Sequence, residues 1–187
     1  STIIQSLFKT GLFSDISISN IEETLNITLL ENPTVKYFDF NLDSGSGFSN
    51  WLKGEKMLMS NQILEEELKV SRLSVGSPFT QSKLDKLIET LKSKYFDSGY
   101  YNVLITSNIS VDEQNRAGIE LNITQGNRVK IESFNINGAN NISTKELLKL
   151  FKIGEADMVL VNYFTNKDLF TETEFSQGID LMTNLYF

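Results

Sequence analysis

The stretch LDKLIETLKSKYFDSGYYNVLI, residues 84–105, decides the fold class because the spacing of its apolar residues changes partway along. The first part has the 3.6-residue spacing of a helix with one apolar face, at Leu84, Leu87, Ile88, Leu91, Tyr95 and Phe96. After Gly99, apolar residues occupy every second position, at Tyr101, Val103 and Ile105, as in a strand buried on one side. Glycine readily adopts the left-handed conformation that ends helices, so Gly99 marks the change from helix to strand.

The same passage occurs three times. Residues 7–13, LFKTGLF, repeat the helix end and the glycine, and an alternating strand follows. Near the C-terminus, Phe170-Thr171 begins a helical pattern in step with the one that follows Phe79-Thr80. The phenylalanines at these helix ends, Phe8, Phe96 and Phe187, lie 88 and 91 residues apart. A repeat of this length predicts tandem domains, because solenoid repeats are only about 20 to 50 residues long.

Length and composition suit a compact fold and exclude several functions. With 187 residues and 40% hydrophobic residues, the chain has room for one or two domains. It shows no apolar run of the roughly 18 residues that a membrane-spanning helix needs, and no signal peptide. Its first residues resemble the middle of a helix, so we expect a piece of a longer chain. The net charge of −7, with scattered Lys and Arg, argues against nucleic-acid binding.

The sequence predicts neither an enzyme nor a metal or cofactor site. It contains no histidine and no cysteine, which excludes Ser-His-Asp and Cys-His catalysis and the usual zinc sites. The acidic candidates fall on predicted solvated faces or in turns without a convergent pair: Glu65, Glu66, Glu67, Asp97, Asp112 and Glu113. Asp43, Asp112 and Glu113 are too widely spaced for a calcium loop.

The middle of the chain reads as strand, helix, helix, strand, strand. We predict a strand at 34–42, a helix from Ser60 or Asn61 to Lys69, a helix through residue 96, and strands at 101–111 and 117–125. Residues 1–33 supply the end of a preceding unit, with a hairpin of 15–20 and 25–30. Residues 127–187 begin a third unit with a strand at 128–136 and a capping box at Ser143. The predicted domains are 1–33, 34–126 and 127–187.

Both predicted first strands change the direction of their apolar residues partway, between Val35 and Phe38 and again between Val129 and Phe134. This shared shift predicts either a β-bulge or a strand whose two halves pack against different partners. Residues 43–56 form a Gly- and Ser-rich loop carrying the only tryptophan. Its Phe48 and Trp51 either pack back on the body or contact a partner.

These features resemble the POTRA domain family. The matching motifs are the helix ending in Tyr95-Phe96, then Gly99-Tyr100, then a hairpin with Asn115-Arg116 that runs directly into the next unit. The resemblance covers nearly the whole chain except residues 43–56. It implies tandem α+β modules, each a three-stranded mixed sheet covered by two helices on one face.

The resemblance also implies a role in the periplasm of a Gram-negative bacterium. There the chain would be the soluble part of an outer-membrane β-barrel assembly factor, with a C-terminal barrel and partner lipoproteins. The alternatives are a two-partner secretion transporter, a translocation and assembly module, or a passive structural spacer.

An exposed sheet edge is the predicted binding site. Unpaired backbone groups on an edge strand can take an extended segment as a further strand, with little demand on sequence, which suits unfolded outer-membrane proteins as clients. We expect Thr106 and Asn108 to present outward-facing amides, and the segment Ile16–Ser19 to be the equivalent strand of the first unit. The residues of the predicted edge are Tyr101, Asn102, Val103, Leu104, Ile105, Thr106, Ser107, Asn108 and Ile109.

Overall fold

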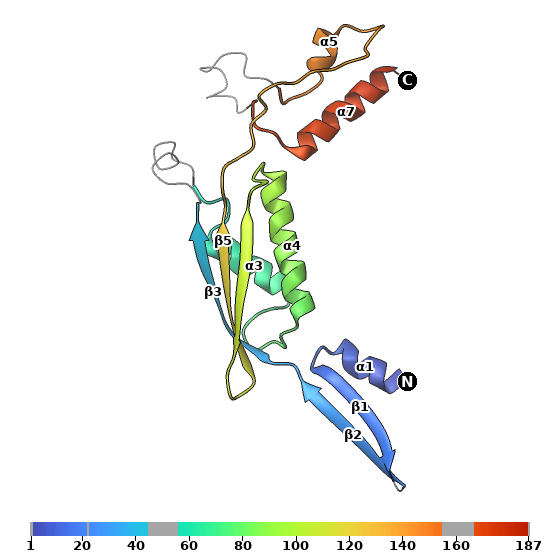
Figure 1. Cartoon of the computed structure of the whole chain (residues 1–187), viewed down its shortest axis with the longest axis vertical. Helices are drawn as coiled ribbons and strands as arrows, with labels where there is room; N and C mark the ends of the chain where they lie inside the picture. The colour runs from blue at the N-terminus through green and yellow to red at the C-terminus, as the bar shows by residue number, and fades with distance from the viewer. Residues whose placement is uncertain (1, 22, 45–55, 155–166, 187) are drawn as a thin grey trace. The chain divides into compact units, whose positions relative to one another are not determined.

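A computed structural model describes residues 2–21, 23–44, 56–154 and 167–186. The chain divides into two compact units. The first comprises 1–43, 57–91 and 105–123, and the second comprises 44–56, 92–104 and 124–187. The helices and strands, labelled in Figure 1, are α1 (Thr2–Lys9), β1 (Phe13–Ile21), β2 (Thr24–Glu31), β3 (Thr34–Asp43), α3 (Asn61–Val70), α4 (Gln81–Asp97), β4 (Leu104–Val111), β5 (Arg116–Thr124), α5 (Thr144–Leu148) and α7 (Glu172–Tyr186).

Three strands form a mixed sheet with β5 in the centre, in the order β3-β5-β4. The amide of Thr34 donates to Asn115 O at 3.0 Å, and Asn41 Nδ2 donates to Asn122 Oδ1 at 2.9 Å. Both contacts join residues 81 positions apart, so β3 and β5 run parallel. The tight turn between β4 and β5 makes that pair antiparallel. The α+β prediction with a mixed three-stranded sheet is therefore confirmed.

Helices α3 and α4 cover one face of this sheet (Figure 1). Every second residue of β5 is at most 1% exposed, and the facing helix positions are almost as deeply buried. This alternation is what a strand with one covered face requires. The buried residues are Ala117, Ile119, Leu121 and Ile123 from β5, Leu64 and Leu68 from α3, and Leu84, Leu87 and Leu91 from α4.

The two glycines that mark the repeat have the same local structure. Gly11 and Gly99 both follow a helix and both have positive φ, at +71° and +86°. Each donates its N–H to the phenylalanine three residues earlier, Gly11 to Phe8 O at 3.0 Å and Gly99 to Phe96 O at 2.8 Å. These bonds close the helix end in a conformation that disfavours side chains with a Cβ. The helix end predicted at Gly99 is confirmed, and the strand that follows begins at Leu104.

A second feature is repeated in the structure. It joins the beginning of each sequence repeat to the turn before the long helix of that repeat. Thr34 forms an isolated antiparallel bridge with Pro78, and Lys130 forms the same bridge with Leu169. The flanking backbone bonds match as well: Phe79 N to Pro33 O and Val35 N to Ser77 O in one unit, Phe170 N to Val129 O and Ile131 N to Asp168 O in the other. In the structure, Val35 therefore corresponds to Ile131. The sequence pattern instead pairs Val35 with Val129, which lies two residues earlier.

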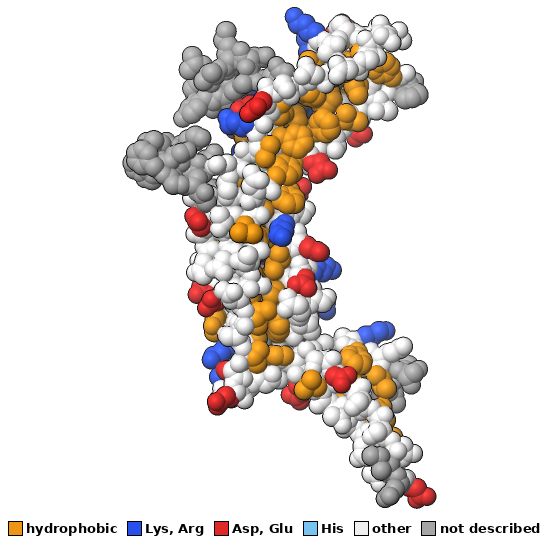
Figure 2. Space-filling view, viewed as in Figure 1, with side chains coloured by type: hydrophobic (Ala, Val, Ile, Leu, Met, Phe, Trp, Pro, Cys, Tyr) orange, Lys and Arg blue, Asp and Glu red, His pale blue; other side chains and the backbone are white. Residues whose placement is uncertain are grey.

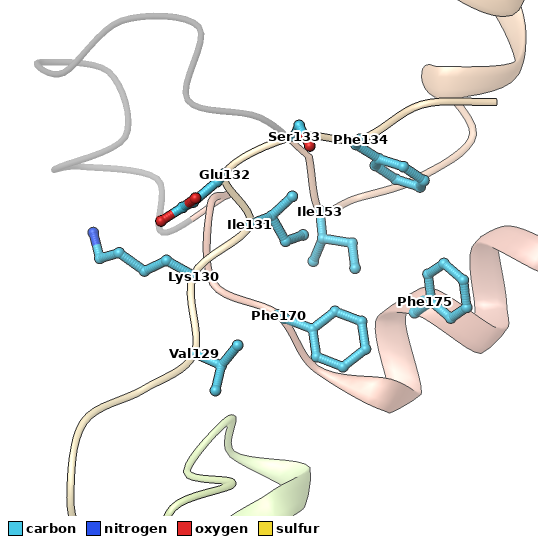
Figure 3. Close-up of a pocket in the computed structure, with 9 residues that line it drawn as sticks. All are labelled: Val129, Lys130, Ile131, Glu132, Ser133, Phe134, Ile153, Phe170 and Phe175. Carbon is cyan, nitrogen blue, oxygen red and sulfur yellow. The ribbon is translucent and has the colours of Figure 1, made fainter.

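The predicted strand at 128–136 does not form. Apart from the bridge at Lys130, this segment has no regular secondary structure, because no described strand lies alongside it to accept its backbone bonds. Its residues 129–134 instead line a cavity of about 480 Å³. Figure 3 shows Ile131, Ile153 and Phe170 facing this space, with Lys130 and Glu132 directed away.

The predicted first hairpin is confirmed as β1 paired with β2, slightly longer than expected. Ile16 lies opposite Leu29 and Ile18 opposite Ile27, so these side chains share one face. Most of this face is exposed, with Ile27 at 55% and Leu25 at 64%. Figure 2 shows hydrophobic side chains at the surface where α1 and the hairpin meet. The corresponding face of β5 is fully buried, so the described part of the chain gives this hairpin far less cover.

Helices α5 and α7 correspond to α3 and α4, but the sizes of two packed residues differ. A larger residue at one position is compensated by a smaller residue at the other. Ser143 caps α5 as Ser60 caps α3, each accepting from the amide three residues later. Counting from these caps, Phe151 takes the place of Leu68. Counting from Thr80 and Thr171, Gly178 takes the place of Leu87. A Cβ on Gly178 would lie 2.1 Å from Phe151 Cδ1, so the ring occupies the space that a side chain would need.

We predict that Gly178→Ala lowers the free energy of unfolding by about 1–3 kcal/mol, although alanine favours helices, because the methyl group overlaps the Phe151 ring. Adding Phe151→Leu should restore most of the loss, since leucine stands at the matching position of α3. Urea denaturation followed by circular dichroism measures both. Wild-type stability for Gly178→Ala alone would contradict the packing.

Tyr95 on α4 is fully buried, and its hydroxyl has no hydrogen-bond partner among the described residues. Its ring meets Tyr100 edge-on, with centroids 6.0 Å apart. Burial, aided by the nearby Tyr100, raises the pKa of Tyr95 to about 12. The ring therefore contributes packing while the oxygen contributes a desolvation cost.

Tyr95→Phe should leave stability at pH 7 unchanged or raise it by about 1 kcal/mol, since only an unpaired oxygen is lost. In the wild type the unfolded tyrosine ionises near its ordinary pKa of 10, but the folded one does not until about 12. Stability should therefore fall as pH rises through this window. Denaturation at pH 7 and pH 11 should show a smaller fall for the variant.

Candidate partner-binding edge of the sheet

Strand β4 is one edge of the three-stranded sheet, and among the described strands β5 is its only neighbour. The predicted binding segment only partly coincides with it. Tyr101 and Asn102 form a turn after α4, Val103 follows, and the strand begins at Leu104 and continues past Ile109 to Val111. The strand starts late because Val103 N still bonds back to Tyr100 O, at 3.4 Å. Alternating apolar residues through the turn made it resemble a strand in sequence.

The turn between β4 and β5 fixes which amides of β4 are free. Asp112 N donates to Arg116 O at 3.0 Å, so Asp112 faces β5 with its backbone groups. Along an antiparallel strand, the backbone groups of successive residues point alternately toward and away from the neighbouring strand. The even-numbered residues of β4 therefore bond to β5, and Ile105, Ser107 and Ile109 direct their N–H and C=O groups to the open side. The burial of Ile105 opposite Ile123 agrees with this register. Thr106 and Asn108 thus face β5, contrary to the expectation from sequence.

An ion-pair cluster holds this turn. Asp112 accepts from Arg116 Nε at 3.0 Å and from Lys36 Nζ at 3.1 Å, and also from the amides of Gln114 and Arg116. The Arg116 guanidinium first, then Lys36 and the two amides, hold the pKa of Asp112 well below its ordinary range. The cluster ties the start of β3 to the β4–β5 hairpin.

The other edge, β3, is partly closed. Val35 donates to Ser77 O at 2.9 Å and accepts from Gly76 N at 2.8 Å, so a turn covers its first residues. Farther along, Phe40 N donates to the carboxylate of Asp39 at 3.0 Å. Such side-chain and turn caps are common protection for sheet edges. In the described residues, nothing comparable bonds to the open side of β4.

The β4 edge also has no charged side chain. From Ser98 to Val111 the sequence has no Asp, Glu, Lys or Arg. Most natural edge strands carry charges that oppose pairing with other chains. Leu104 and Val111 are more than half exposed on this strand. An uncharged open edge can accept another strand without an electrostatic penalty.

Comparison with known proteins identifies the central fold. Residues 52–126 match the family model described as "POTRA: Surface antigen variable number repeat". This chain contains a POTRA domain. The helices α3 and α4 and the strands β4 and β5 lie within the matched residues.

Two curated relatives are similar over essentially the whole chain. The outer membrane protein assembly factor BamA of Neisseria meningitidis is 27% identical over 186 residues, and BamA of Buchnera aphidicola is 25% identical over 188. The aligned region is 22% and 28% of these relatives' lengths, so the chain spans about a quarter of each. A crystal structure of Haemophilus influenzae BamA POTRA3-5 has a TM-score of 0.50 at 17% identity, covering 100% of this chain and 69% of that one. It supports the fold.

The remaining predicted site residues lie elsewhere. Ile16–Ser19, which the sequence predicts to be equivalent to the β4 edge, lies within β1, whose partner is β2. Phe48 and Trp51 fall outside the described residues. Within the described ranges there is no group of three or more His, Cys, Asp or Glu side chains placed to hold a metal ion. In the same ranges, no helix has the length and apolar character needed to cross a bilayer.

Sequence reasoning missed an aromatic cluster next to the β4 edge. The ring of Tyr101 stacks on Phe96, with centroids 5.4 Å apart, and contacts Phe170 at 5.6 Å. The signal was the run of aromatic residues Tyr95, Phe96, Tyr100 and Tyr101 around Gly99, which helical and strand periodicity had assigned to the two elements separately.

Proposed function

We propose that this chain belongs to the periplasmic receptor region of an outer-membrane β-barrel assembly factor. In this role the open edge of β4 takes unfolded outer-membrane proteins as an added strand. The observation that carries the proposal is an uncharged edge strand whose Ile105, Ser107 and Ile109 leave their backbone groups unpaired in the described structure. The similarity to the two assembly factors named BamA supports the setting.

The expected binding is weak and reversible. Three residues offer three donors and three acceptors, and each backbone bond adds about 1 kcal/mol net. Ordering an extended segment costs about 1–2 kcal/mol per residue, so backbone pairing alone roughly cancels. Side-chain contacts must supply the surplus. This balance suits a site that holds many different clients briefly and releases them.

The two sides of β4 differ in chemistry. Ile105, Ile109 and Val111 point to the helix-covered side, whereas Thr106, Asn108 and Ser110 point to the open face, as the strand's alternation requires. An added strand with alternating apolar and polar residues matches both sides. Membrane-spanning strands of β-barrels have this alternation.

We also propose the division into POTRA modules at 1–33, 34–126 and 127–187. The repeated bonds at Gly11 and Gly99 and the repeated bridges at Thr34 and Lys130 support it. In the full-length protein a C-terminal outer-membrane barrel would follow, and partner lipoproteins of an assembly complex would bind the periplasmic modules. The loop carrying Phe48 and Trp51 stays a candidate partner contact. No catalytic role is proposed.

The strongest rival is a passive spacer that holds a barrel near its partners. A two-partner secretion transporter or a translocation and assembly module would use the same domain with other clients. A photoreactive residue at Ser107 separates spacer from receptor, because a spacer should crosslink to no unfolded client at this position.

We predict that Ser107→Pro reduces binding of a synthetic peptide copied from a transmembrane strand of an outer-membrane barrel by at least fivefold. Its amide faces the open side, so the fold should survive while one donor and the strand geometry are lost. Fluorescence anisotropy measures the affinity, and circular dichroism checks the fold.

Thr106→Pro is the matched comparison. Its amide faces β5, so proline there should destabilise the hairpin by about 3 kcal/mol or more. If Ser107→Pro stays folded and binds the peptide as tightly as the wild type, β4 is not the binding edge. If Thr106→Pro is the milder of the two in stability, the register of free amides is wrong.

A further inference from the structure

The turn after α4 contacts the beginning of α7. Tyr101 Oη accepts a hydrogen bond from Glu172 N at 3.0 Å. Glu172 is the first residue of α7, and the first amides of a helix have no partner within the helix. Thr171 Oγ1 accepts from Glu174 N at 3.4 Å and leaves Glu172 to Tyr101. One helix start is thus capped jointly by its own threonine and by a tyrosine 71 residues earlier.

The surrounding contacts hold the same two segments together. Val129 N donates to Gly99 O at 2.9 Å, and Phe170 N donates to Val129 O at 3.0 Å. A Cβ on Gly99 would lie 2.9 Å from Phe170 O, so the backbones approach as closely as glycine allows. The ring of Tyr101 lies between Phe96 and Phe170, in contact with both. Packing on both sides of the Tyr101 ring therefore fixes the position of its hydroxyl group.

Among the described residues, the preceding repeat shows no such cap. Aligned on Gly11 and Gly99, Phe13 takes the place of Tyr101 and has no hydroxyl. The receiving helix has the same threonine cap: Thr80 Oγ1 accepts from Lys83 N at 3.4 Å, as Thr171 Oγ1 accepts from Glu174 N. Gln81 therefore corresponds to Glu172. The two helix starts differ in the bond to Tyr101 and in the side chain three residues after the cap, where Thr171 Oγ1 donates to Glu174 but Lys83 Nζ donates to Pro78 O. The comparison between Glu172 and Gln81 therefore concerns the first helical amide alone.

We propose that Tyr101 is a positioning residue that latches the first turn of α7 to the turn after α4, and that the start of α4 has no such latch. The latch is separate from partner binding, because it uses a side chain that precedes β4. It gives Tyr101 a role that the binding-edge hypothesis did not include. It also makes the start of α7 depend on one hydroxyl group 71 positions away in sequence.

Amide hydrogen exchange measured by NMR on the whole chain tests the proposal. In Tyr101→Phe the aromatic contacts stay and only the acceptor is lost. Exchange at the Glu172 amide should become about five to ten times faster, as expected for one hydrogen bond. The Gln81 amide is the internal control and should not change.

Tyr101→Ala removes the ring as well and should accelerate exchange at Glu172 further and extend the effect to Phe170. Unchanged exchange at Glu172 in Tyr101→Phe would overturn the latch, even if Tyr101→Ala has an effect, because packing alone would then hold α7. Equal acceleration at Gln81 and Glu172 would also overturn it, since that pattern reports general unfolding.

Discussion

The burial of β5 is the constraint on which the rest of the POTRA fold depends. Its alternate residues from Ala117 to Ile123 are at most 1% exposed, so this strand has to lie in the middle of the sheet under both helices. Once β5 is central, β3 and β4 are both edges. The parallel partner β3 comes from a separate part of the chain. The antiparallel partner β4 connects to β5 directly through a tight turn that Asp112 stabilises. The open edge thus follows from where the apolar residues of β5 lie.

The two edges of the sheet are treated differently by the chain. Around β3, a turn and a carboxylate accept or supply the backbone bonds that an edge leaves open, at Val35 and Phe40. Along β4 the sequence from Ser98 to Val111 carries no charged side chain, and no described residue outside the sheet bonds to the open side of this strand. An edge without such protection is a liability for an isolated protein, because it invites pairing with other chains. The chain protects the β3 edge and leaves the β4 edge open, and the proposed binding at β4 rests on this difference.

The sequence predicted the local elements well and the long-range details poorly. Period changes and caps located α3, α4 and the first hairpin, because helix and strand spacing and the caps at Ser60 and Gly99 are local properties. The segment 128–136 has strand spacing too, but a strand also needs a neighbour. The free amides were misassigned because their direction depends on the bond between Asp112 and Arg116, which no spacing reveals. Likewise, Tyr101 contacts Glu172 only after the chain has folded.

The exchange of Leu68 and Leu87 for Phe151 and Gly178 means that the repeated helices are not interchangeable one at a time. A helix borrowed from α4 and placed at α7 would bring a leucine into the space of a phenylalanine ring. Borrowing α3 as well would remove the ring and make room. The size of the residue at 178 is therefore tied to the size of the residue at 151, and the same space is filled by a different pair of side chains in each helix pair.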